Sequence, residues 1–242
     1  MATVSIRDTC QDCLGRTGEL RVYRDLFGYP WGRINRDLRV RRHIENIRAS
    51  SINLCVFFVG HEPRFAGTFT QAQAISTQHA IDLMREIYEQ ADLGVRRIFW
   101  RYINDVDALP YLSVNAGGAT DLTQAYSGPN DGIDLFMVQA ITDAGGWSNT
   151  RGPCDKDDSG RTGAVVDVNT TPSNDFLGVL VAHEVAHYLT LPHTDSATNL
   201  MGVDLLPPPS GDGIAELSLN SRDIIATQRS RMRNSCWVRD PC

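Results

Sequence analysis

Three of the six histidines lie within eleven residues, around a single acidic residue, in the run HEVAHYLTLPH that ends at His193. Residues four apart on a helix lie on one face about a turn apart, so His183 and His187 can present their imidazole nitrogens to the same point. Imidazole nitrogen is a preferred zinc ligand. Local helix geometry alone therefore predicts two ligands of a metal site.

A third ligand requires the chain to change direction, because a histidine further along the same helix would point away from the metal. Pro192 disfavours helical geometry at Leu191, so we expect the helix to stop near Leu189 or Thr190. His193 would then turn back toward the metal as the third ligand. The fourth position would stay open for water, as in catalytic zinc sites.

Glu184 lies beside the first of these histidines and is not needed as a ligand. It is free to take a proton from water at the metal, whose pKa zinc lowers to roughly 7. The alternative is a chance His-Glu-x-x-His on an amphipathic helix, which the correctly spaced third histidine disfavours.

The run HEVAHYLTLPH resembles the zinc signature HExxHxxGxxH of the metzincin metallopeptidases, and Thr198 to Gly202 resembles the Met-turn that lies beneath the metal in that family. Thr190 stands where the family usually has Gly, and a β-branched residue has a steric cost at unusual backbone angles. The sequence near the site is similar to the reprolysin-like and pappalysin-like branches. Residue by residue, the resemblance implies zinc on His183, His187 and His193, Glu184 as general base and Met201 as the Met-turn residue.

The same resemblance implies an α+β fold with an α/β-like upper lobe: a twisted mixed five-stranded sheet, two long helices and a small, mainly irregular C-terminal lobe with a final helix. Residues 1–50 are expected to form an N-terminal extension or prosegment-like region. Residues 51–193 would be the upper catalytic lobe with the zinc-binding helix, and 194–242 the lower lobe with the Met-turn. In some metzincins a prosegment Cys or Asp covers the metal, a role open to Cys10, Cys13 or Asp25.

Apolar patterns predict the elements that would carry the site. The continuous apolar run from Ile52 to Gly60 is expected of a strand covered on both faces. Apolar residues at spacings of four predict a long helix over 70–93, and strands are predicted over 97–103 and 133–141. Strand, helix, strand suggests a parallel pair with a helical crossover.

The later segments complete this prediction. Residues 115–132 are polar and Gly-rich and are interpreted as a loop. Residues 145–149 occupy the place where metzincins carry the edge strand that pairs with an extended substrate, although a plain turn also fits two glycines and a Trp. Residues 164–168 are predicted as the last strand. Ser173 or Asn174 can cap the zinc-binding helix, and 221–234 is predicted as the final helix.

The acidic segment from Asp155 to Gly160 opens like a calcium loop, with oxygen donors at its first, third and fifth positions and Gly at the sixth. Val166 stands at the twelfth position, where an EF-hand requires a bidentate Glu, so an EF-hand is excluded. A looser Ca²⁺ site and a solvated turn remain as alternatives.

The composition narrows the class of protein. A net charge of -6 and a pI near 5.5 argue against a nucleic-acid binder, which usually carries a basic face. No stretch approaches the ~20 apolar residues of a membrane span. The first residues, MATVSIRDTCQDC, lack the pattern of a signal peptide, so either export does not use that route or the chain begins after a leader.

The six cysteines permit fifteen complete pairings, among which the sequence does not choose. Cys10 and Cys13 form a C-x-x-C without a second such pair, so a structural zinc knuckle lacks half its ligands. Cys236 and Cys242 are suited to tie down a C-terminal tail. We favour disulfides, and with them a secreted protein in an oxidising compartment.

Taken together, the sequence predicts a zinc-dependent endopeptidase acting on protein or peptide substrates, with Zn²⁺ as cofactor. Two alternatives stay open. One is a metzincin-fold binding module that is weakly active or inactive, and the other is a zinc hydrolase of a non-peptide amide. The sequence does not predict the oligomeric state.

Overall fold

The computed structural model describes residues 5–6, 18–19, 50–62, 65–128, 131–142, 144–156, 163–169, 173–202 and 217–239. The strands are β1 (Ser5–Ile6), β2 (Gly18–Glu19), β3 (Ser50–Val59), β4 (Leu93–Ile103), β5 (Ser113–Val114), β6 (Ile133–Val138), β7 (Ala140–Ile141), β8 (Gly146–Ser148) and β9 (Gly163–Asp167). The α-helices are α3 (Gln71–Tyr88), α4 (Asp105–Ala108), α5 (Ala116–Tyr126), α6 (Asn174–Tyr188) and α7 (Ala226–Arg233), with 3₁₀ turns η3 (Glu89–Ala91) and η4 (Leu109–Tyr111).

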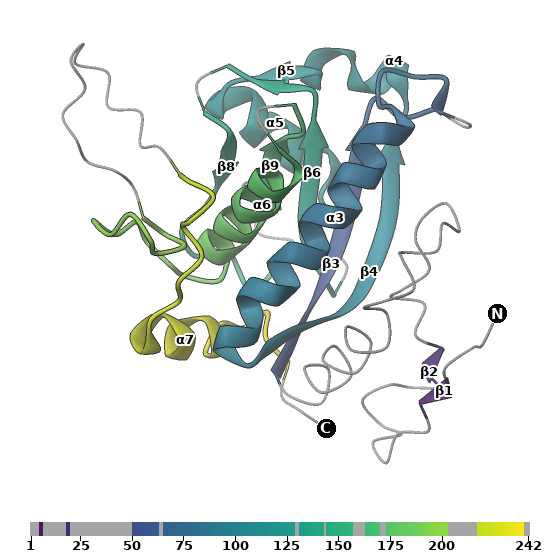
Figure 1. Ribbon diagram of the computed structural model, residues 1–242. Coiled ribbons are helices and arrows are strands. Elements are labelled where there is room, and N and C mark those ends of the chain that lie inside the picture. Colours follow the sequence, from purple (N-terminus) through teal and green to yellow (C-terminus); the bar gives the residue numbers. More distant parts are fainter. Residues whose placement is uncertain are drawn as a thin grey trace, which may run out of the picture.

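The main sheet has five strands in the order β4-β3-β6-β9-β8. The first four strands run parallel, and β8 pairs antiparallel with β9 at the edge. This mixed sheet with two long helices confirms the α+β fold predicted from the sequence, including the parallel β3–α3–β4 crossover (Figure 1).

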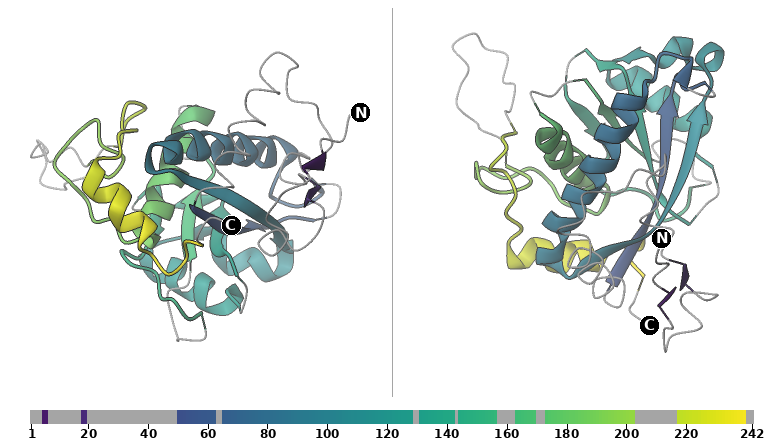
Figure 2. Two further views of the ribbon diagram at one scale, coloured as in Figure 1. Left: turned by 90° about the horizontal axis from the view of Figure 1, so that it is seen from below. Right: turned by 45° about the vertical axis from the view of Figure 1, so that its right-hand side comes forward.

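Helices cover both faces of the sheet, which explains the uninterrupted apolar run of β3. The long helices α3 and α6 lie on one face, as both views of Figure 2 show. Gly178 lets these two helices approach closely, because a Cβ there would lie 2.7 Å from the Cβ of Leu83. On the other face, Ala119 and Leu122 of α5 join a second core cluster with Phe57 of β3.

The loop predicted over 115–132 is wrong in its first half, because α5 occupies it. The two glycines and the weak apolar pattern hid this helix. Its stability comes from a cap and from tertiary packing: the Asn115 side chain accepts a hydrogen bond from the Gly118 amide, and the buried Ala119 and Leu122 pack on the sheet.

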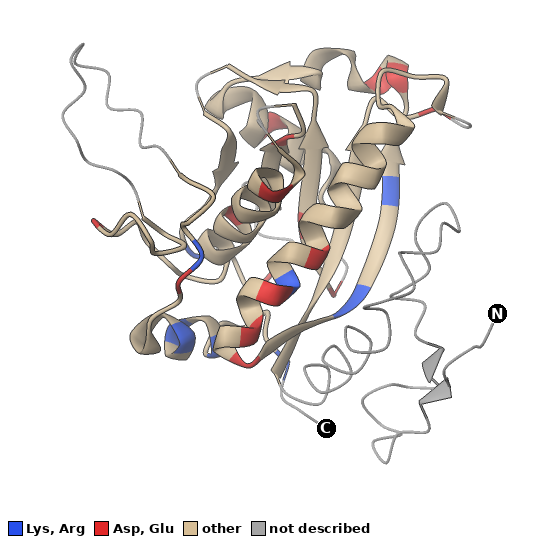
Figure 3. Ribbon diagram, viewed as in Figure 1, with Lys and Arg blue, Asp and Glu red and all other residues tan. Residues whose placement is uncertain are grey.

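Other element ends also differ from the prediction, and β4 begins at Leu93, four residues before the predicted start at residue 97. The first long helix ends at Tyr88 rather than Leu93, since η3 follows and Asp92 adopts a left-handed backbone with φ of 51°. The last helix begins only at Ala226, whereas 221–234 was expected. Figure 3 shows basic residues on α7 and β4 and acidic residues along α3.

A disulfide joins Cys154 to Cys236, across 82 residues of sequence, and so ties the segment after β8 to the end of α7. This bond agrees with the disulfides favoured from the sequence, whereas Cys55, in the middle of β3, is a buried free thiol. Cys10, Cys13 and Cys242 lie outside the described residues. Among the described helices, none has the length and apolarity to cross a membrane.

Candidate metal centre

Helix α6 carries the first two predicted ligands in the centre of the molecule. Its N-terminus is capped by Ser173, whose hydroxyl accepts from the Phe176 amide at 3.2 Å. From Leu177 to Leu189 every residue is buried, polar ones included. A helix that is enclosed all round holds its side chains in fixed positions, which suits residues that must converge on one point.

The helix ends in a Schellman turn that reverses the chain. The Leu191 amide donates to the Ala186 carbonyl at 3.0 Å, and the Thr190 amide donates to the His187 carbonyl at 2.9 Å. Thr190 has φ of +86°, in the left-handed region where glycine is favoured. Thr190 thus adopts the left-handed backbone for which the signature resembled by this sequence has a glycine. The turn directs His193 back toward α6.

The three imidazoles meet through their Nε2 atoms. The Nε2 of His193 lies 3.2 Å from that of His183 and 2.9 Å from that of His187. Each helix histidine uses its other nitrogen on a carbonyl: His183 Nδ1 donates to Leu200 O and His187 Nδ1 to Leu191 O, both at 2.7 Å. Because a carbonyl can only accept, Nδ1 carries the proton and the Nε2 lone pairs are left to face one another.

The electrostatic surroundings keep these rings neutral. Burial, followed by the neighbouring His187, lowers the pKa of His183 to about 3. Burial also lowers the pKa of His187 to about 4 and shifts the pKa of His193 downward. Neutral imidazole is the form that binds a metal, so proton competition for these nitrogens is weak near neutral pH.

This donor set fits a zinc ion. Tetrahedral zinc with Zn–N distances of about 2.0–2.1 Å separates its ligand nitrogens by roughly 3.3 Å, close to the two separations given above. The Nε2 lone pairs of His183 and His187 face the Nε2 atom of His193, so a cation between the three rings could bind all three nitrogens. His183, His187 and His193 form the one group of three or more potential metal ligands found among the described residues.

Glu184 lies next to this group and directly beneath the edge strand. A Cβ on Gly146 of β8 would overlap its carboxyl oxygen Oε1, so glycine is what permits the close approach. Burial raises the pKa of Glu184 from its ordinary value of 4.5 to about 8. A carboxyl group with a pKa near neutrality, adjacent to a candidate metal site, is suited to move protons.

The predicted Met-turn, residues 198–202, contacts His183. Leu200 supplies the carbonyl that holds His183, and Met201 is fully buried. The Thr194 amide donates to the Met201 carbonyl at 2.8 Å, while the Met201 amide donates to the Asn199 side chain at 2.9 Å. These bonds fix the turn relative to both the helix and the segment that carries His193.

Asn199 is in turn locked by a reciprocal amide pair with Gln228 of α7, with both hydrogen bonds 2.8 Å long. Both side chains are buried. The final helix therefore supports the Met-turn through Asn199, a role that could not be predicted for a glutamine on the apolar side of that helix.

Other sequence predictions lie away from this centre. The Nε2 atom of His79, on α3, lies 2.6 Å from Asp175 Oδ1, so this histidine forms an ion pair or hydrogen bond away from the metal centre. In the acidic segment, Asp155 is exposed and the Lys156 ammonium lies 2.8 Å from the buried Asp134, so calcium is not supported there. Residues 157–160 of that segment and the prosegment candidates Cys10, Cys13 and Asp25 lie outside the described residues.

Sequence reasoning missed the carbonyls of Leu191 and Leu200 that orient the rings, and the contact of Gly146 with Glu184. These carbonyls could not be predicted from residue types, because every residue has a backbone carbonyl. The Gly145-Gly146 pair was a usable signal, since glycine often marks a close approach in a strand.

No family model and no curated protein matches the sequence. Among solved structures, the chain is similar to archaemetzincin from Methanopyrus kandleri, with 14% identity over 76% of this chain and 95% of that one and a TM-score of 0.49. It is also similar to metalloproteinase-II from Bacteroides fragilis, with 12% identity over 77% of this chain and 53% of that one and a TM-score of 0.49. The chain thus spans about half the length of the second. The function proposed below rests on the geometry of the site.

Proposed function

We propose that this protein is a zinc-dependent endopeptidase of the metzincin type. The observation that supports this most is the convergence of three imidazole Nε2 atoms beside a buried glutamic acid, under the edge strand of a sheet. His183, His187 and His193 would hold zinc and leave one side for water and substrate. The assignment to a reprolysin-like or pappalysin-like branch stays a prediction.

A bound zinc ion supplies Lewis acidity, which lowers the pKa of water and polarises a peptide carbonyl. Glu184 accepts the proton of the attacking water and later donates it to the leaving amine. In the metal-free protein burial raises the pKa of Glu184 to about 8, and this environment suits a carboxyl group that must return a proton to the leaving amine.

The edge strand supports a peptide as substrate. The Asp167 amide donates to the Gly145 carbonyl at 2.9 Å, and hydrogen-bonded pairs alternate along an antiparallel ladder. Gly145 and Trp147 therefore turn their backbone groups to β9, whereas Gly146 and Ser148 turn theirs outward. An extended peptide can add to this edge as a further strand and pass above the histidines.

The disulfide between Cys154 and Cys236 supports a role in an oxidising, extracellular setting.

The test is the Glu184→Gln variant, loaded with zinc and incubated with a mixture of peptides, with and without a chelator. The variant should bind zinc as the wild type does and cleave at least about 10²-fold more slowly, the contribution of a general base. Glu86→Gln, on the exposed side of α3, is the matched control and should cleave normally.

Undiminished cleavage by Glu184→Gln would refute this mechanism. If the zinc-loaded wild type cleaves no peptide, the endopeptidase proposal is rejected. The alternatives are then a binding module and a hydrolase of a non-peptide amide, which a panel of non-peptide amides separates.

A further inference from the structure

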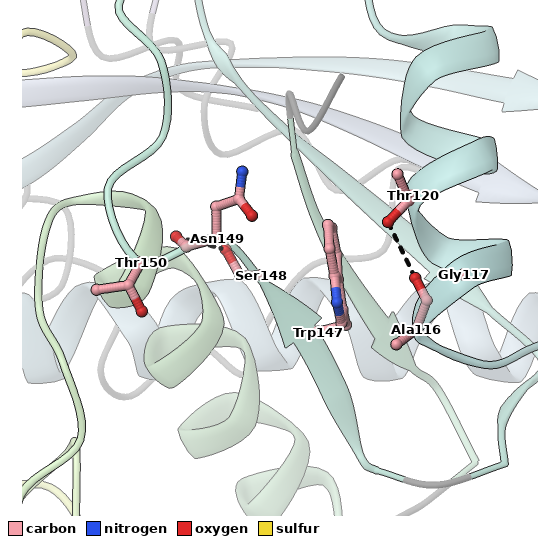
Figure 4. Close-up of a pocket in the computed structure, with 7 residues that line it drawn as sticks. All are labelled: Ala116, Gly117, Thr120, Trp147, Ser148, Asn149 and Thr150. Carbon is pink, nitrogen blue, oxygen red and sulfur yellow. Dashed lines mark hydrogen bonds between the residues drawn. The ribbon is translucent and has the colours of Figure 1, made fainter.

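A pocket of about 610 Å³ opens between β8 and the first turns of α5, within the size range of ligand-binding pockets. Figure 4 shows Trp147 standing between the two sides. Ala116, Gly117 and Thr120 line it from α5, and Ser148 and Asn149 line it along the edge-strand segment. The catalytic account above makes no use of this pocket.

The pocket lies on the opposite face of β8 from Glu184. Side chains alternate along a strand, and the Cβ position of Gly146 points at Glu184, so Trp147 projects to the α5 face. A peptide paired with the outward groups of Gly146 and Ser148 would place one residue directly opposite Trp147. Residues directly opposite project to the same face, so the side chain of that residue would enter the pocket.

The chemistry of the lining favours a bulky uncharged occupant. None of the lining residues carries a charge, so a charged side chain would lose hydration without a compensating partner. Trp147 packs against the second core cluster, which holds its indole in place for ring stacking. The Thr120 hydroxyl donates to the Ala116 carbonyl at 3.0 Å, and Gly117 leaves the opposite side without a side chain.

We propose that this pocket selects a bulky uncharged side chain, aromatic ones foremost, at a single position of the peptide substrate. Trp147 supplies the stacking surface and Gly117 supplies the space. The inference rests on the proposed peptidase function, which fixes the path of the peptide along β8.

Gly117→Leu fills the pocket without disturbing the core. Gly117 is exposed and has no positive φ, and an added Cβ would lie 3.3 Å from the Asn115 side-chain oxygen, so this capping side chain must shift by a few tenths of an ångström. Gln124→Leu adds the same apolar group to an exposed site of α5 outside the pocket and is the matched control.

Cleavage mapping with a peptide library first locates the selective position, and peptides that differ only there, with Phe, Ala or Lys, are then compared. The wild type and Gln124→Leu should prefer Phe to Ala and Ala to Lys, with about a tenfold or larger ratio of kcat/KM between Phe and Ala. Gly117→Leu should reduce that ratio to near one. An unchanged ratio in Gly117→Leu, or no selective position at all, overturns the proposal.

Peptide binding to the zinc-loaded Glu184→Gln protein, followed by fluorescence anisotropy, separates this inference from the peptidase proposal. If the wild type cleaves nothing, the peptidase proposal fails while the pocket is still judged by binding. Preference for the Phe peptide that Gly117→Leu abolishes supports the pocket. Equal binding of the Phe and Lys peptides overturns it.

Discussion

The candidate metal centre has two sides, called here the histidine wall and the edge-strand wall, and they are built in different ways. On the histidine wall, His183 and His187 are buried and each is held by a backbone carbonyl, while the turn around Met201 is fixed by further buried hydrogen bonds. On the edge-strand wall, β8 is half-buried, has one neighbouring strand in the described sheet and turns backbone groups outward. Side chains that must converge on one metal ion are held by several hydrogen bonds each. A strand that must pair with peptides of different sequence keeps its outward backbone N–H and C=O groups available.

Gly146 of β8 lies against the Glu184 side chain, so the two walls meet at this residue. Substitution of Gly146 should therefore have the largest effect on activity. In Gly146→Ala the new methyl group overlaps Glu184 Oε1, and either the carboxyl group or the strand must move. We expect kcat/KM for a peptide to fall by about 10²-fold, the effect of a misplacement near 1 Å, while zinc content stays unchanged. At Gly128 an added Cβ meets nothing within 4 Å, so Gly128→Ala should keep full activity. Equal activity of both variants would contradict this account of the contact.

The amide pair beneath the histidine wall should matter for stability. Asn199→Ala removes both hydrogen bonds to Gln228 and leaves that buried amide without them. We expect the free energy of unfolding, measured with denaturant, to fall by about 1–3 kcal/mol. Asn220→Ala, at an exposed site, should change it by no more than about 0.5 kcal/mol. A similar small change in both variants would show that the pair does not stabilise this wall.

Glu184 should give the metal-free protein a characteristic pH dependence. Burial raises the pKa of its carboxyl group from 4.5 to about 8, so the folded state holds this proton more tightly than the unfolded chain does. The contribution to stability is complete below pH 4.5 and is lost as the pH rises through about 8. Denaturant unfolding should therefore show Glu184→Gln gaining stability relative to the wild type between pH 5 and pH 9. A difference that stays constant over this range would speak against a buried, neutral Glu184.

Thr190 should show the smallest effect. A left-handed backbone costs a non-glycine residue roughly 1–2 kcal/mol. Glycine avoids this strain, but it also makes the unfolded chain more flexible, which offsets part of the gain in stability. We expect Thr190→Gly to raise the free energy of unfolding by roughly 0.5–1 kcal/mol and to keep zinc binding. Destabilisation would mean that the 3.4 Å hydrogen bond from the Thr190 hydroxyl to the Arg231 carbonyl outweighs the strain.

The sequence was most informative where structure depends on near neighbours. The spacing of His183 and His187 and the turn before Pro192 are local features, and the apolar run of β3 and the periodicity of α3 are direct consequences of burial. These patterns were sufficient for the α+β fold and for the candidate ligands. The departure at Thr190 also marked a residue with a positive φ.

The remainder depends on contacts between distant segments. Nothing near Cys154 or Cys236 selects their pairing out of fifteen. The residues of α5 have a weak intrinsic helix propensity. The helix is stabilised because Leu122 packs in the core cluster on the second face of the sheet. The amide pair of Asn199 and Gln228 joins residues 29 apart, and the pocket beside Trp147 appears only once α5 and β8 are placed next to each other.

Metal analysis of the purified protein tests the central claim most directly. After dialysis with zinc and then against buffer, the wild type should retain about one zinc ion per chain. His187→Ala should lose at least about 10²-fold in zinc affinity, since it removes one of three ligands. His79→Ala should bind zinc as the wild type does. A wild type that retains no zinc, or a His187→Ala protein that binds it equally well, would contradict a zinc site on these three histidines.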